Sequence, residues 1–179
     1  MQLHPKNCTA YAHRGLFFFG HKQYALAAKD FDTALSLQRT VLEYAYWRGR
    51  AYSQAGRYDL ALADFNQLLG LHNVYQGDPF RAQLLNDCAW IEATCPDARY
   101  RNAKLAVGNA EIAVRMGGHR QCSYLDTLAA AYAELGDFDS AIKTQEKAMA
   151  AQTKTAKIKG GDERLALYKQ HRPYRDNVR

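Results

Sequence analysis

Four cysteines and six histidines are the residues of this chain with the widest range of chemistry. A thiol activated by a histidine is a nucleophile, and both side chains bind metal ions. The chain has no C-x2-C pair, and no two histidines stand at the spacing of metal ligands on a helix. We therefore expect no metal, no cofactor and free thiols, as in a reducing cytoplasm. The cysteines are Cys8, Cys88, Cys95 and Cys122.

The sequence also lacks the motifs of the common catalytic classes. It has no glycine-rich phosphate loop, no G-x-S-x-G elbow and no H-E-x-x-H helix. Asp30 and Asp32 lie two apart on a predicted helix, so their carboxylates point to different faces and do not form a catalytic pair. Cys95 lies at a predicted helix C-terminus, where the helix dipole raises the pKa of a thiol. We predict a structural role for Cys95 and no enzymatic activity.

The net charge of +6 is concentrated near the C-terminus. Residues 1–150 carry 16 Lys and Arg against 15 Asp and Glu, whereas residues 151–179 carry 8 against 3. A nucleic-acid-binding domain carries a basic stripe across the fold itself, so nucleic-acid binding through the tail is the least favoured function. No apolar run approaches the roughly 18 residues of a membrane span, and residues 1–7 lack the core of a secretory leader. We expect a cytoplasmic protein without membrane partners.

The elements that position these residues follow from an internal period. Gly15 and Gly49 lie 34 residues apart, and the residues around one recur around the other. A unit of this length is a helix–turn–helix that cannot bury its apolar face alone, so units must stack into a solenoid. The residues that repeat are Tyr11, Phe18, Tyr24, Ala27, Phe31 and Ala34, matched by Ala45, Tyr52, Tyr58, Ala61, Phe65 and Leu68.

The pattern, W-x2-L-G-x2-Y followed by A-x3-F, resembles the tetratricopeptide repeat. A further match surrounds Tyr132, with Gln145 at a position that is usually aromatic. Between these units lies a divergent one. Its stretch from Leu85 to Trp90, followed by A-T-C-P-D, resembles the L-A-W…A-T-C-P-D units of bacterial tetratricopeptide proteins, including those attached to serine/threonine kinases. The resemblance implies an all-α, right-handed superhelical array with a C-terminal capping helix.

We expect the array to span residues 3–151 in about four units, at 8–40, 41–74, 79–116 and 121–151. Residues 95–101 form a long turn inside the third unit. Asp78, Asp137 and Asp162 are expected to cap the helices that follow them. Residues 152–179 comprise a basic linker and a short helix. Its Leu165, Leu167 and Tyr168 are predicted to cover the last unit by packing on the helix at 138–150.

The resemblance also implies that the first helix of each unit lines a concave groove. The candidate partner-binding residues are Leu16, Phe19, Tyr46, Arg50, Gln54, Asn86, Trp90 and Asp126. Phe19 and Trp90 suit a packing role equally well. Some members of the family hold a chaperone carboxylate with a lysine and asparagine clamp. Ala12 and Leu16 stand where that clamp needs its first Lys and Asn, which disfavours this mode.

These features favour a non-catalytic scaffold that binds a partner peptide or helix in the groove. The alternative is a structural or regulatory segment of a larger protein, for example one associated with a kinase. Leu3–Asn7 matches the closing phrase of a repeat, L-x-P-x-N, whose helices would precede the chain as given. An uncovered first unit would expose Tyr11, Phe18 and Phe31. We therefore expect either more chain upstream or a homodimer through the first unit.

Overall fold

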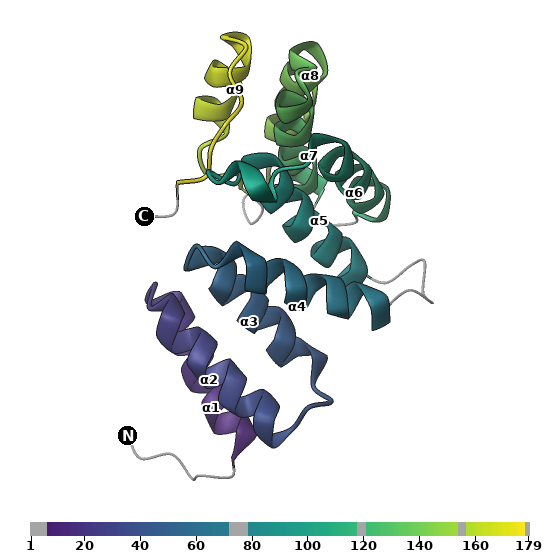
Figure 1. The fold of residues 1–179 in the computed structure, drawn as a ribbon. Coiled ribbons are helices and arrows are strands. Elements are labelled where there is room, and N and C mark those ends of the chain that lie inside the picture. The colour runs from purple at the N-terminus through teal and green to yellow at the C-terminus, as the bar shows by residue number, and fades with distance from the viewer. Residues whose placement is uncertain (1–6, 72–78, 118–120, 154–156, 178–179) are drawn as a thin grey trace. The chain divides into compact units, whose positions relative to one another are not determined.

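The computed structural model describes residues 7–71, 79–117, 121–153 and 157–177, and their regular structure is helical throughout (Figure 1). The helices are α1 (Cys8–Gly20), α2 (Tyr24–Leu37), α3 (Leu42–Gln54), α4 (Tyr58–Leu71), α5 (Pro79–Thr94), α6 (Ala103–Met116), α7 (Gln121–Leu135), α8 (Phe138–Ala150) and α9 (Gly161–Lys169), with a 3-10 helix, η1 (Ala98–Tyr100), between α5 and α6.

The chain divides into two compact units, with the boundary between them near residue 73 of the sequence. In the N-terminal unit, α1 packs on α2, α2 on α3, and α3 on α4. In the C-terminal unit, α5, α6, α7 and α8 pack in the same sequential way, α5 also contacts α7, and α9 packs on α8. Each helix therefore packs on its sequence neighbours within its unit, which confirms the predicted helical repeat architecture.

Side-chain caps and left-handed glycines set several helix ends. Asn7 accepts a hydrogen bond from the Ala10 N–H at 3.0 Å, and Asp137 accepts one from Ser140, as predicted for Asp137. Gly56 (φ 73°) and Gly136 (φ 87°) lie in the turns after α3 and α7, where a positive φ favours glycine.

The structure corrects one predicted helix cap, adds a short helix to a predicted turn, and leaves two predictions outside the residues that it describes. The expected cap at Asp162 is wrong, because α9 already begins at Gly161 and Gly160 (φ 73°) occupies the cap position. The long turn at 95–101 contains η1, which the sequence pattern did not indicate. The cap at Asp78 and the phrase beginning at Leu3 lie outside the described residues.

Two phenylalanines lie directly against the periodic glycines. A Cβ on Gly15 would lie 3.0 Å from Phe31 Cζ, and one on Gly49 would lie 2.7 Å from Phe65 Cε1. Each ring can therefore pack between the two helices of its pair only because the preceding helix has a glycine, with no side chain, at the point of contact. The expectation that Phe31 is exposed at an open first unit is wrong, because this packing buries it completely.

An arginine–aspartate pair repeats with the same period. Arg14 Nε lies 2.6 Å from Asp30 Oδ2, and Arg48 Nη2 lies 2.7 Å from Asp64 Oδ1. Arg48 also reaches Asp32 of the preceding pair, at 2.7 Å. Asp30 is buried and Asp32 is exposed, so the two carboxylates face different ways, as predicted. The pairing of Arg48 joins two successive helix pairs.

The last helix pair is covered by α9. Tyr168 is fully buried in a cluster with Ala129, Ala133 and Ala141, and Leu167 packs against the same cluster. The prediction that Leu167 and Tyr168 close the array is thereby confirmed. Leu165 is half-buried and does not belong to that cluster.

We predict that Gly49→Ala destabilises the protein. Placing a methyl group 2.7 Å from the Phe65 ring overpacks the core, at a cost of about 1–3 kcal/mol that exceeds the gain in helix propensity. Gly108→Ala is the matched control, because the space around Gly108 within α6 is open, and it should stabilise by about 0.4–1 kcal/mol. Urea denaturation measures both. Equal stability of the two variants would refute the close approach.

A second prediction concerns α9, which covers the last helix pair. Tyr168→Ala should lower the free energy of unfolding by about 3 kcal/mol, because it empties a buried site beside three alanines that cannot fill the space. Leu165→Ala, on the same helix but half-exposed, should cost less than about 1.5 kcal/mol. Thermal denaturation of both variants checks the difference, and a Tyr168→Ala melt matching wild type would show that α9 does not stabilise the array.

Candidate functional site

Within the N-terminal unit, the structure brings together three of the predicted partner-binding residues. The guanidinium carbon of Arg50 lies 5.4 Å from the ring centroid of Phe19, 5.8 Å from that of Tyr46 and 5.0 Å from that of Trp47. Phe19 comes from the end of α1, Tyr46 and Trp47 are adjacent on α3, and Arg50 lies one turn further along α3. We call Phe19, Tyr46, Trp47 and Arg50 the arginine–aromatic surface.

The rings of this surface support one another. Phe19 and Trp47 meet edge to face with centroids 5.3 Å apart, and Tyr46 and Trp47 do so at 5.7 Å. Tyr46 is the buried member, with 7% of its surface exposed, and its ring lies 6.2 Å from that of Phe65. Both Phe19 and Tyr46 therefore have packing roles, and together with Trp47 they fix the position of the Arg50 side chain.

Arg48 and Arg50 differ in their electrostatic partners. Two residues along a helix correspond to a rotation of about 200°, so these side chains leave α3 on opposite sides. Arg48 donates hydrogen bonds to Asp64 and Asp32, and the bond to Asp64 is the main reason that its pKa is raised. The Arg50 guanidinium, by contrast, forms no hydrogen bond or ion pair with any residue that the structure describes.

Leu16 and Gln54 are the other predicted site residues of these two helices. Leu16 is 37% exposed on α1, and Gln54 is half-buried at the end of α3. Trp47 was not among the predicted site residues. Its position three residues before Arg50, one helical turn away, is the sequence signal that would have identified it.

The predicted site residues of the C-terminal unit are already bound by other parts of the chain. Asp126 is buried and accepts hydrogen bonds from Arg164 at 2.8 and 3.0 Å and from Gln145 at 2.7 Å. Burial raises the pKa of the Asp126 carboxyl, and its bonds with Arg164 and Gln145 oppose that rise. The Trp90 indole N–H donates to Asp176 at 2.7 Å.

Asn86 has a weaker set of contacts. It is 8% exposed, its amide nitrogen lies 3.4 Å from Asp87 Oδ1, and its Oδ1 atom has no hydrogen-bond partner among the described residues. Sequence reasoning identified Asn86, Trp90 and Asp126 as one side of the first helices. It missed Arg164 and Asp176, because they lie outside the repeat pattern.

Three of the four thiols lie in the core of the C-terminal unit, and the fourth, Cys8, is half-buried on α1. Cys88, Cys95 and Cys122 are buried, and burial raises the pKa of the Cys88 and Cys95 thiols. For Cys95 the direction agrees with the sequence-based prediction, but the main cause is burial rather than the helix dipole. Within the described ranges, no group of three His, Cys, Asp or Glu side chains is placed to hold a metal ion.

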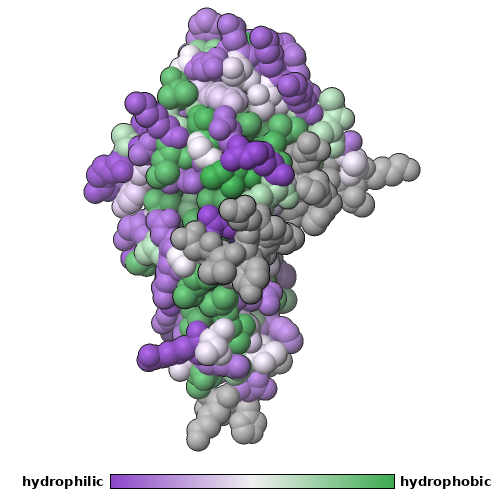
Figure 2. Space-filling model, turned by 90° about the vertical axis from the view of Figure 1, so that its right-hand side faces the viewer, coloured by the Kyte–Doolittle hydropathy of each residue, from purple (hydrophilic) through white to green (hydrophobic). Residues whose placement is uncertain are grey.

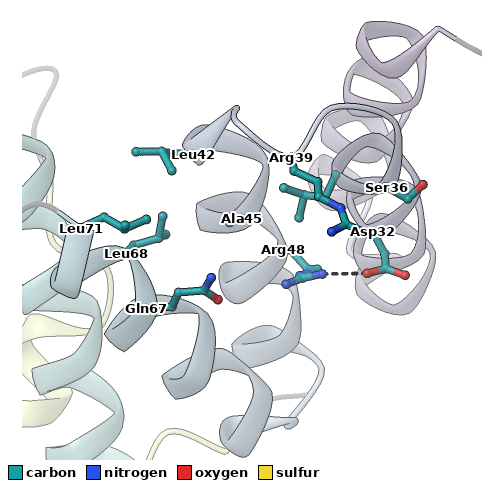
Figure 3. Close-up of a pocket in the computed structure, with 10 residues that line it drawn as sticks. Asp32, Ser36, Arg39, Leu42, Ala45, Arg48, Gln67, Leu68 and Leu71 are labelled. Carbon is teal, nitrogen blue, oxygen red and sulfur yellow. Dashed lines mark hydrogen bonds and ion pairs between the residues drawn. The ribbon is translucent and has the colours of Figure 1, made fainter.

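The N-terminal unit also has a surface pocket of about 340 Å³ (Figure 3). Three of its polar residues are engaged: Arg48 binds Asp32, and the Ser36 hydroxyl donates to the Thr33 carbonyl. The pocket therefore has a mixed lining of apolar and polar side chains, with the Arg48–Asp32 ion pair as a polar contact across the wall. It is lined by Asp32, Leu35, Ser36, Arg39, Leu42, Ala45, Arg48, Gln67, Leu68 and Leu71.

Exposed apolar side chains are distributed over several helices. Figure 2 shows, on one face, hydrophobic residues gathered in patches that hydrophilic residues border. Phe17 and Leu71 are the most exposed of the large apolar residues described, at 58% and 59%.

No described helix combines the length and the apolar character that a membrane crossing requires.

Comparison with known proteins agrees with this architecture. The model of the tetratricopeptide repeat family matches residues 42–73 and 123–155. No curated protein sequence matches the chain. Among solved structures, TTC0263, a thermophilic tetratricopeptide protein of Thermus thermophilus, has 21% identity and a TM-score of 0.63. The match covers 82% of this chain and 75% of that one.

Two structures of MamA have the same fold. One has 18% identity and a TM-score of 0.64, covering 82% of this chain and 79% of that one. The other, from Desulfovibrio magneticus, has 17% identity and a TM-score of 0.60, covering 84% and 78%. The family model falls on α3–α4 and on α7–α8, and the other helix pairs pack in the same way, so the chain contains tetratricopeptide repeats.

Proposed function

We propose that this protein is a non-catalytic interaction module whose arginine–aromatic surface binds a partner peptide through a carboxylate group. The observation that carries the proposal is the Arg50 guanidinium, which has no acceptor among the described residues and which Phe19, Tyr46 and Trp47 hold in place. Tetratricopeptide-repeat proteins are in general binding scaffolds, and the surface lies on the first helices, where the family binds its partners.

The physical basis is a cation whose position is fixed before binding. A guanidinium over aromatic rings keeps its full charge and its hydrogen-bond donors, because the rings occupy its face and leave its edge for an acceptor. A carboxylate satisfies two of these donors at once. Since the rings restrict the side chain in advance, less conformational entropy is lost on binding.

The aromatic rings add a requirement for an apolar neighbour. Trp47 and Phe19 are half-buried, so each still presents part of its ring to solvent. Tryptophan, tyrosine and arginine are the residues that most often dominate binding energy at interfaces. The favoured ligand is therefore a peptide with an Asp, Glu or terminal carboxylate beside an apolar side chain, and Leu16 and Gln54 are its flanking contacts.

The proposal differs from the family's two-lysine, two-asparagine carboxylate clamp. Ala12 and Leu16 occupy the positions where the first unit of that clamp needs its Lys and Asn. The charge here comes from Arg50 on α3, with aromatic side chains around it.

We place the module in the cytoplasm, consistent with three buried free thiols in the C-terminal unit.

The test is a peptide-display selection on the full chain, followed by affinity measurement. Wild type should enrich peptides with an acidic residue beside an apolar one. Arg50→Gln should weaken the selected peptide about tenfold or more, because a charge-assisted hydrogen bond contributes about 1.5–3 kcal/mol. The free energy of unfolding should fall by no more than about 1 kcal/mol, since Arg50 makes no ion pair with the described residues and loses only its contacts over the rings.

Arg57→Gln is the matched control. Arg57 is exposed in the turn before α4, so its loss changes net charge equally without touching the surface. Its affinity should equal that of wild type. Equal weakening by both substitutions would mean that only overall charge attracts the peptide, and an unaffected Arg50→Gln variant would reject the proposed contact.

A further inference from the structure

The last described residues of the chain lie on the first helices of the C-terminal unit. We call residues 172–177 the tail segment. It follows α9 without regular structure, and its contacts with α5 fall on the end of that helix. Its contacts fall on Trp90 and Thr94 of α5 and on Glu134 of α7.

The tail segment satisfies backbone groups at the end of α5. This helix ends at Thr94, and the carbonyl groups of a last helical turn have no partner within their own helix. The Thr94 carbonyl accepts a hydrogen bond from the Asp176 N–H at 2.9 Å, and Arg175 Nη1 lies 3.5 Å from the Ala93 carbonyl. Backbone contacts of this kind do not depend on side-chain identity, and they are typical of the recognition of extended peptides.

Side-chain contacts add specificity. Arg175 Nη1 lies 2.7 Å from Glu134 Oε2, and Asp176 Oδ2 accepts the hydrogen bond from the Trp90 indole at 2.7 Å. The ring of Tyr174 lies 6.0 Å from that of Trp90. Three consecutive tail residues thus each meet a different group: an aromatic ring, a carboxylate and an indole N–H.

The long turn after α5 helps to build this surface. Arg101 Nε lies 2.9 Å from Glu134 Oε1, while its Nη1 donates to the carbonyls of Cys95 and Pro96 at 2.7 and 3.0 Å. Glu134 is therefore held by Arg101 on one oxygen and presents the other to Arg175. The insertion that makes the third repeat divergent has a role here, because it orients the carboxylate that the tail segment contacts.

A change within the repeat pattern serves the same surface. Aligned by the period, Asp126 of the α7–α8 pair stands where the α3–α4 pair has Tyr46, and Gln145 stands where that pair has Phe65. The aromatic contact of one pair is replaced in the other by a hydrogen bond of 2.7 Å. The resulting polar pair holds Arg164, whose guanidinium carbon lies 5.4 Å from the Trp90 centroid and 5.3 Å from that of Tyr174.

The α9 helix and the tail segment differ in how firmly they are held. Arg164 and Tyr168 of α9 are 4% and 0% exposed, so α9 belongs to the core of its unit. Residues 173–176 are half-buried: Arg175 and Asp176 make polar contacts, and the Tyr174 ring packs against the cluster that contains Tyr168. Detaching the tail segment removes one half-buried ring from this cluster, whereas detaching α9 opens the core itself.

We propose that the face formed by Trp90, Thr94 and Glu134 is a peptide-recognition surface, and that the tail segment occupies it as an intramolecular competitor. The ligand is an extended peptide with an aromatic residue, an arginine and an acidic residue in succession, as in Tyr174–Asp176. A partner protein that carries this pattern gains the surface by displacing the tail segment while α9 stays in place. This inference is independent of the role proposed for Arg50.

The experiment uses the full chain and a fluorescein-labelled peptide with the sequence of residues 170–177. An attached competitor has a high effective concentration, so wild type should bind the probe weakly. The double variant Arg175→Ala/Asp176→Ala loosens the tail segment and leaves the surface intact. It should bind the probe about tenfold more tightly or better, as measured by fluorescence anisotropy.

Two controls separate displacement from general loosening. Gln170→Ala/Arg172→Ala alters exposed residues of the same region that contact each other, and it should bind the probe as wild type does. A probe with glutamine in place of Arg175 should bind the loosened variant poorly. A loosened variant with native circular dichroism and no gain in probe binding would overturn the proposal and leave the tail segment a structural cover.

A measurement on wild type covers the case in which the double variant fails to fold. The unlabelled peptide with Asp176→Asn, added in excess, should shift the indole N–H resonance of Trp90, because it replaces the charged Asp176 acceptor with a neutral amide. An unchanged Trp90 resonance at saturating peptide would equally overturn the proposal.

Discussion

The structure depends on one constraint: a single helix pair cannot bury its own apolar side, so every pair must be covered by another element. Within a pair, Phe31 and Phe65 approach the preceding helix at Gly15 and Gly49, where any side chain would collide. Between pairs, Arg48 bonds to carboxylates on both sides of the junction. At the end of the array, α9 inserts the fully buried ring of Tyr168. The periodic glycine–phenylalanine contacts, the ion pairs and the final helix thus all help to hold a covering element on the apolar side of a helix pair.

Covering these apolar sides leaves the opposite side of each first helix for recognition, and the two units use it differently. In the N-terminal unit, the side of α3 opposite Arg48 carries Arg50 over three aromatic rings. In the C-terminal unit, the corresponding side of α5 carries Trp90, whose indole is bound by Asp176. The Arg50 guanidinium has no acceptor among the described residues, whereas the Trp90 indole N–H already has one in Asp176 of the same chain. The two proposals rest on this difference.

The sequence was sufficient for the features that repeat. The helices, their pairing and the cap at Asp137 follow from local patterns that recur at a fixed spacing, so each recurrence supports the others. The contacts of Asp126 and Trp90 could not be predicted, because their partners are 38 and 86 residues away and no period relates them. One signal was present in Gln145, a polar residue at an aromatic position, which indicates that a polar network replaces the usual ring there.

The most direct test of the account uses the fact that the chain has two tryptophans, one on each surface. Indole N–H resonances of Trp47 and Trp90 are to be followed by NMR while an acidic–apolar peptide selected on wild type is added. The account predicts that the Trp47 signal shifts to saturation, because the peptide carboxylate binds the adjacent Arg50, while the Trp90 signal stays in place under the tail segment. Movement of Trp90 with Trp47 unchanged would contradict it, since the peptide would then bind away from the arginine–aromatic surface.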